Sequence, residues 1–234
     1  MAQTLPGSLF KNTMFLAFVL ILTICGSAVG SERHALVIGN ADYDSKTLTA
    51  LKNPANDAAL VADSLRSAGF TVELVLNANL RTMKRSVRDF SDKLKAAPKG
   101  SLSAFYYSGH GFEAGGKNYL APLEADLRDE VDAEFEALSV DWVLTAVESS
   151  HEGANIVILD ACRNTALTRS AGGTAGGFSL LTSTPRGSFI SFATAPGSTA
   201  TDGAGLNSPY TAAIAREMLV PGASIETVFK RVRQ

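Results

Sequence analysis

Short apolar runs alternate with amphipathic stretches along most of this chain. The runs have the length of strands, and several are apolar throughout, which is typical of strands covered on both faces. We therefore predict strands at residues 34–40, 70–76, 101–108, 155–159 and 188–193.

The stretches between these runs have helical periodicity. The clearest is the series Leu80, Met83, Val87, Phe90 and Leu94, in which apolar residues recur every three or four positions. Further helices are predicted at 56–68 and 139–147, from Ser208-Pro209 to before Pro221, and from Ser224 onward, and Gly115-Gly116 predicts a tight hairpin. The alternation of strands and helices predicts an α/β fold, with a mostly parallel sheet and helices on both faces.

The first 30 residues have the pattern of a targeting segment. Residues 14–25 are almost wholly apolar, but the run is shorter than the ~20 residues that span a bilayer as a helix. Ala28 and Gly30 stand at positions −3 and −1 of a cleavage site before Ser31. We expect residues 1–30 to be a signal peptide and the protein to be exported, periplasmic or secreted. The alternative is an uncleaved anchor, which would be the only membrane association.

Composition excludes several classes of protein. Hydrophobic residues make up 46% of the 234 residues and charged residues 19%, so the chain can bury a core and is not disordered as a whole. A formal net charge of −2 argues against a nucleic-acid binder that relies on positive charge. Two cysteines cannot build a disulfide-rich scaffold or a four-cysteine zinc site. Removal of the leader removes Cys25 and leaves Cys162 as the single thiol.

Two predicted strands end in residues with catalytic potential. The strand 101–108 continues into Gly109-His110-Gly111, and 155–159 continues into Asp160-Ala161-Cys162. Reactive groups gather at the carboxyl ends of parallel strands, and a thiolate beside an imidazole is a nucleophile. If the two strands are neighbours, the N–H groups of Gly111 and Cys162 are candidates for an oxyanion hole. The simpler interpretations are a buried hydrophobic cysteine and a histidine in a turn.

The two motifs together resemble a known family. Residues 106–111 (YYSGHG) and 159–164 (LDACRN) are similar to the His and Cys motifs of the caspase-like cysteine peptidases, family C14. Cys162 follows His110 by 52 residues, the approximate spacing described for that family. The resemblance covers about residues 32–233, is closest to the bacterial metacaspase- and paracaspase-like branch, and includes residues 35–40, 53–58 and 191–195.

The resemblance implies a fold and a reaction. The fold would be the caspase-like three-layer sandwich over residues 31–234, with a flexible linker between subunits at 165–187. The chain stops inside or just after its last predicted helix, so we expect a truncated C-terminus. The reaction would be endopeptidase cleavage by a Cys162–His110 dyad, with no third residue evident that orients the histidine. Arginines of the linker region, among them Arg169 and Arg186, are candidate self-cleavage points.

The resemblance also implies a specificity. An acid two residues before the cysteine, here Asp160, belongs to enzymes that accept Arg or Lys before the cut bond, and Asp57 and Asp202 match further acidic positions of that pocket. A carboxylate cluster binds a guanidinium through charge-assisted hydrogen bonds. The simpler interpretations are a first-turn helix acid for Asp57 and an Asp-Gly turn for Asp202.

The expected partners are therefore protein or peptide substrates with Arg or Lys before the cut bond, and no nucleic acid. No cofactor or metal is expected. Some metacaspases need calcium, and the acidic stretch 124–136 is a candidate for it, although a solvated loop is the simpler interpretation. Two alternatives to the peptidase remain: a non-catalytic caspase-like binding or scaffold domain, and a different cysteine-dependent hydrolase or transferase.

Overall fold

The computed structural model describes residues 30–161, 178–179, 181, 186–193 and 205–233. The predicted leader up to residue 29 lies outside the described residues, as does most of the predicted linker 165–187. Cys162 and Asp202 also lie outside them. Among the residues that are described, no helix is long and apolar enough to cross a membrane.

A five-stranded parallel sheet forms the centre of the molecule, in the order β2-β1-β3-β7-β8. Each of its strands coincides with one of the five predicted strands to within two residues at either end. Their bounds are β1 Arg33–Gly39, β2 Thr71–Leu76, β3 Leu102–Ser108, β7 Ala154–Asp160 and β8 Ser188–Phe192.

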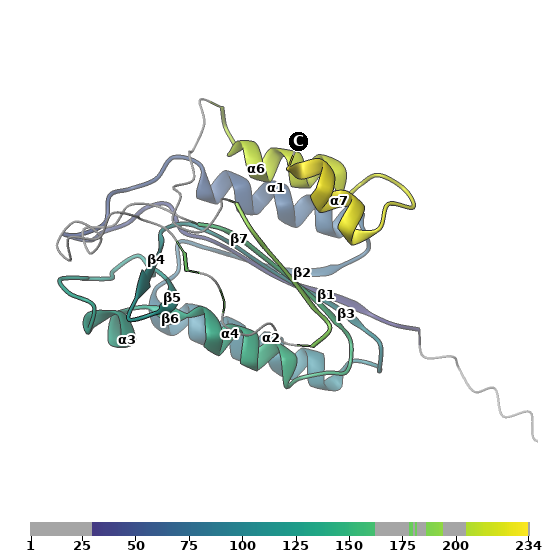
Figure 1. Cartoon of the computed structure of the whole chain (residues 1–234), viewed down its shortest axis with the longest axis horizontal. Helices are drawn as coiled ribbons and strands as arrows, with labels where there is room; N and C mark the ends of the chain where they lie inside the picture. Colours follow the sequence, from purple (N-terminus) through teal and green to yellow (C-terminus); the bar gives the residue numbers. More distant parts are fainter. Residues whose placement is uncertain (1–29, 162–177, 180, 182–185, 194–204, 234) are drawn as a thin grey trace, which may run out of the picture.

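Helices cover both faces of this sheet, as predicted (Figure 1). One layer contains α1 (Pro54–Ser67), α6 (Pro209–Glu217) and α7 (Ile225–Val232), and the other contains α2 (Leu80–Ala96) and α4 (Val140–Glu148).

Alternate residues of the central strands supply the two cores between these layers. Val37 and Tyr106 pack with the α1 layer, whereas Ile38 and Tyr107 pack with the α2 layer. Because successive side chains point to opposite faces and both faces are covered, most positions of these strands are apolar, and the strands are nearly continuous apolar runs in the sequence.

A small antiparallel sheet, β4-β5-β6, follows β3 and lies beside the main sheet. Gly115 and Gly116 join β4 to β5 with φ values of 57° and 79°, and positive φ at both central residues is the geometry of a type I′ hairpin turn. The hairpin prediction is therefore confirmed. The bounds are β4 Gly111–Ala114, β5 Lys117–Leu120 and β6 Leu138–Ser139.

The sequence suggests a loop over the whole acidic stretch 124–136, but the structure contains a helix there. Its last part forms the short helix α3 (Asp132–Glu136), which buries Ala133 completely. Glu134 pairs with Lys117 of the hairpin at 2.6 Å, and this hydrogen bond holds the pKa of Glu134 below its usual value. Glu124 accepts the N–H of Leu80 at the start of α2. Among the described residues, no group of three or more Asp, Glu, His or Cys is placed to hold a metal ion.

Candidate active site

The ends of β3 and β7 lie next to each other, as the catalytic hypothesis requires. Ser108 pairs with Asp160 in the parallel register, and the N–H of Gly109 donates to the Asp160 carbonyl at 3.4 Å. A Cβ on Gly111 would stand 2.9 Å from the Cβ of Ala161. The residue after His110 and the residue before Cys162 are therefore in contact at one edge of the sheet.

His110 is held in a defined orientation by groups that the sequence did not reveal. Its side chain is 4% exposed, and Nε2 lies 2.8 Å from the carbonyl oxygen of Thr49. The edge of the Tyr43 ring faces the imidazole, with centroids 4.7 Å apart and planes at 65°. If Nε2 carries the proton and donates it to Thr49, the basic lone pair of the imidazole is on Nδ1.

The backbone around His110 is fixed by two tyrosines. The His110 N–H donates to the Tyr43 hydroxyl at 2.7 Å, and the Tyr107 hydroxyl donates to the His110 carbonyl at 2.9 Å. A Cβ on Gly109 would stand 2.5 Å from the Tyr107 hydroxyl and 2.6 Å from that of Tyr43. Glycine is required before His110 because the two hydroxyls occupy the space of a side chain.

The glycine after His110 lies against another part of the protein. The ring of Phe178 packs where a Cβ of Gly111 would be. The side chain of Asn118 holds Ser179, the residue after Phe178. Asn118 accepts the Ser179 N–H at 2.8 Å and donates to the Ser179 carbonyl at 3.0 Å. The space that this glycine leaves is filled by the protein itself, and the role of its N–H in an oxyanion hole stays a prediction.

Asp160 lies at the carboxyl end of β7 and is completely buried. Its Oδ2 accepts hydrogen bonds from the hydroxyls of Ser208 at 2.5 Å and Thr211 at 2.7 Å, both at the start of α6. The Thr211 hydroxyl lies 2.5 Å from the hydroxyl of Tyr106 on β3. Because the Thr211 proton goes to Asp160, Tyr106 donates to Thr211 and completes a hydrogen-bonded chain.

Asp57, on the first turn of α1, is also completely buried. Its Oδ1 accepts the Ser208 N–H at 2.9 Å and the Asn207 side-chain amide at 3.0 Å, and its Oδ2 is 3.5 Å from the Ser108 hydroxyl. An acid that served only the helix dipole would have no need of these contacts with the chain 150 residues away. The structure therefore brings Asp57 and Asp160 together through Ser208, which binds both.

The two carboxylates change the pKa of the neighbouring Tyr106 hydroxyl. Burial raises the pKa of the Tyr106 hydroxyl well above its usual value, and the negative charges of Asp160 and Asp57 raise it further. Both carboxylates are thus close enough to Tyr106 to act on it electrostatically.

Sequence reasoning missed most of the groups that hold these acids. The sequence indicates Ser208 only as the start of a predicted helix, and it assigns no role to Ser108, Asn207 or Thr211. The one available signal was the position of Ser108 directly before Gly109-His110, where a side chain must emerge at the same sheet edge as Asp160.

Taken together, a parallel sheet between two helical layers, with His110 and the Asp160-Ala161 strand end side by side, defines a caspase-like α/β architecture. The family model for the caspase domain matches residues 32–234, and the chain belongs to this family, the C14 peptidases.

Two curated relatives match part of the chain. It is 30% identical over 137 residues to the human mucosa-associated lymphoid tissue lymphoma translocation protein 1. The aligned region covers 58% of this chain and 15% of that protein. The mouse homologue is 30% identical over 140 residues, covering 59% and 16% respectively. The matched region is therefore about one-sixth or less of the length of these relatives.

Proposed function

We propose that this caspase-family domain is a cysteine endopeptidase that uses Cys162 and His110. The observation that carries the proposal is the contact between the two strand ends, where Gly111 meets Ala161, the residue directly before Cys162. Cys162 follows Ala161 directly in the sequence, so we expect its thiol at the edge of the sheet where His110 lies.

The mechanism follows from these groups. His110 takes the thiol proton, and the sulfur of Cys162 forms a bond to the carbonyl carbon of the substrate. The N–H groups of Gly111 and Cys162 bind the resulting oxyanion, and His110 passes the proton to the leaving amine as the peptide C–N bond breaks. Water, deprotonated by His110, then hydrolyses the thioester and restores the thiol. The Thr49 carbonyl stabilises the imidazolium that forms in each half of the cycle.

We propose that the substrate carries Arg or Lys before the cut bond. Asp57 and Asp160 place two carboxylates at the edge of the sheet where the dyad is expected, and Asp202 is a third candidate that lies outside the described residues. A guanidinium beside buried carboxylates forms charge-assisted hydrogen bonds, whereas an acidic side chain would be repelled. Ser208 and Asn207 already bind these carboxylates, which fixes both acids in place before a basic side chain arrives.

The test is cleavage of matched peptides that differ only in having Arg, Lys or Asp before the cut bond. We expect cleavage of the Arg and Lys peptides and loss of all cleavage in Cys162→Ala. Retention of activity in Cys162→Ala would refute the assignment of the nucleophile. A preference for the Asp peptide would refute the specificity and leave the dyad intact.

A peptidyl ketone ending in arginine separates this function from its alternatives. Stoichiometric labelling at Cys162 supports the peptidase, and the absence of labelling in a correctly folded protein favours a scaffold. Labelling only by electrophiles that lack a peptide favours another cysteine-dependent enzyme.

A further inference from the structure

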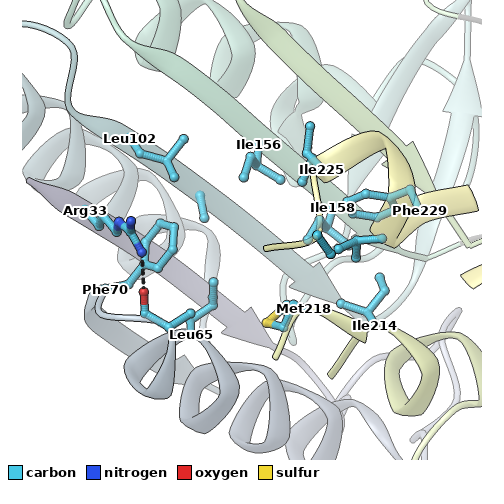
Figure 2. A pocket seen from close by; sticks show the side chains of 14 residues that line it. Arg33, Leu65, Phe70, Leu102, Ile156, Ile158, Ile214, Met218, Ile225 and Phe229 are labelled. Carbon is cyan, nitrogen blue, oxygen red and sulfur yellow. Dashed lines mark hydrogen bonds between the residues drawn. The ribbon is translucent and has the colours of Figure 1, made fainter. Parts of the chain in front are cut away.

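An apolar cavity of about 250 Å³ lies between the α1, α6 and α7 layer and the central sheet (Figure 2). Its lining runs along the sheet from Arg33 and Leu102, at the starts of β1 and β3, to Ile158 of β7, two residues before Asp160. Arg33 pairs with Leu102 in the register, six residues of strand at ~3.3 Å each, or roughly 20 Å, from Ser108 at the edge of the candidate active site. The Arg33 end of the cavity is therefore distant from the site that contains His110 and Asp160, and neither of these two residues lines the cavity.

The walls of this cavity are apolar almost throughout. The α6 and α7 helices contribute Ile214, Met218 and Phe229, α1 contributes Leu65, and the strand β7 contributes Ile156. Met218 and Ile156 are only partly buried, so the lining extends to the surface of the described structure. A cavity lined in this way does not hold ordered water well and favours an apolar occupant.

The one charged residue in the lining is Arg33, the first residue of β1, and it is exposed. Its Nη1 donates to the Ala68 carbonyl at 2.7 Å, which holds the guanidinium over the end of α1 at the cavity (Figure 2). No carboxylate pairs with Arg33 among the residues that the structure describes. A guanidinium has five N–H donors, so this single hydrogen bond leaves donors that suit a carboxylate.

We propose that this cavity binds a medium-chain fatty acid, with the alkyl chain among the apolar side chains and the carboxylate on Arg33. An engineered cavity of about 150 Å³ already binds benzene, so the space here admits a larger hydrocarbon group. The positive charge at the edge of the cavity distinguishes a fatty acid from a neutral lipid. Each methylene that the cavity buries should strengthen binding about fourfold.

The test is calorimetric titration of the full chain with hexanoate, octanoate, decanoate and decanol. We expect saturable 1:1 binding that tightens with chain length, and decanoate binding about tenfold more tightly than decanol. Arg33→Gln should remove the preference for decanoate while decanol still binds. Arg81→Gln, an exposed arginine on α2, is the matched control and should change neither affinity. Absence of saturable binding, or an unchanged preference in Arg33→Gln, would overturn the proposal.

The location is tested by filling the cavity. Ala104 of β3 and Ala68 at the end of α1 both line it, and the larger side chain in Ala104→Leu should abolish binding of both ligands. If Ala104→Leu does not fold, Ala68→Leu at the partly buried edge provides the same test. Ala96→Leu on the opposite layer is the control and should bind as the wild type does. Normal decanoate binding in a folded Ala104→Leu or Ala68→Leu protein would rule out this cavity.

Discussion

The imidazole of His110 is oriented by a main-chain carbonyl rather than by a carboxylate. Thr49 supplies that carbonyl at 2.8 Å from Nε2, and Tyr43 packs its edge against the ring. Every residue has a carbonyl, so a sequence motif cannot show which one is used. This is why the sequence showed the histidine but no partner for it.

Gly109 offers the most direct test of the arrangement around His110. In Gly109→Ala the new methyl group would collide with the hydroxyls of Tyr43 and Tyr107, and overpacking of this kind costs about 1–3 kcal/mol of folding free energy. We expect urea unfolding to show that loss, and peptide cleavage to fall further because His110 is displaced.

The matched control is Gly205→Ala, where the nearest atom to the new methyl group would be 3.7 Å away. Its free energy of unfolding should lie within about 0.5 kcal/mol of that of the wild type. Equal stability of the two variants would show that the tyrosine hydroxyls do not confine Gly109.

At the scale of elements, the start of α6 connects the helical layer to the sheet edge. Ser208 caps the helix by accepting the Thr211 N–H at 3.0 Å, while its own hydroxyl donates to Asp160 and its N–H donates to Asp57. A single serine thus performs an ordinary capping role and holds two acids that come from β7 and α1. Its position explains how α6 is fixed relative to the proposed specificity pocket.

Ser208→Ala should therefore cost more than the loss of a cap. A cap contributes about 1 kcal/mol, and a buried hydrogen bond to a charged group adds about 1.5–3 kcal/mol. We expect a total loss of about 2–4 kcal/mol in urea unfolding, together with weaker selection of Arg over Asp peptides.

Ser224→Ala is the comparison, because Ser224 is an exposed cap that accepts the Thr227 N–H at the start of α7. It should cost about 1 kcal/mol or less and leave peptide selection unchanged. If both serine variants lost the same stability, the link from Ser208 to Asp160 would contribute nothing.

At the scale of the whole molecule, negative charge is buried in the α1–α6 side of the fold. The pKa of Tyr106 is raised well above 10.0 by burial and by the charges of Asp160 and Asp57. In the unfolded chain a tyrosine loses its proton near pH 10, so above that pH the unfolded state binds fewer protons than the folded state. The contribution of Tyr106 to the free energy of unfolding is therefore complete below pH 10, and the free energy of unfolding falls as the pH rises toward the raised pKa of Tyr106 in the folded state.

Tyr106→Phe should weaken this alkaline loss of stability. One retained proton corresponds to a slope of about 1.4 kcal/mol per pH unit, and the variant should lack that contribution between pH 10 and 11. The measurement is urea unfolding as a function of pH for both proteins, with pH 7 to 8 as the baseline for the lost hydrogen bond to Thr211. Parallel curves above pH 10 would show that Tyr106 does not retain its proton in the folded protein.

The sequence by itself determined the secondary structure of the main sheet and its two helical layers. Continuous apolar runs such as 34–40 and the helical series from Leu80 to Leu94 are local patterns, and a local pattern can be recognised without knowledge of the tertiary contacts. For the same reason the Gly115-Gly116 turn was predictable, since its positive φ values are a property of those residues. The short helix α3 was not predictable from its acidic sequence. It depends on the burial of Ala133 and on the pairing of Glu134 with Lys117, which are both tertiary contacts.

Only the tertiary structure decided which distant groups meet at the sheet edge. The register that pairs Ser108 with Asp160, and the hydrogen bonds from Ser208 to Asp160 and Asp57, join residues more than 45 positions apart. Such contacts depend on how strands are ordered and how helices pack over them, and one-dimensional periodicity contains no record of either. The cavity beside Arg33 has the same origin, because its volume is what remains between α1, α6, α7 and the sheet after they pack.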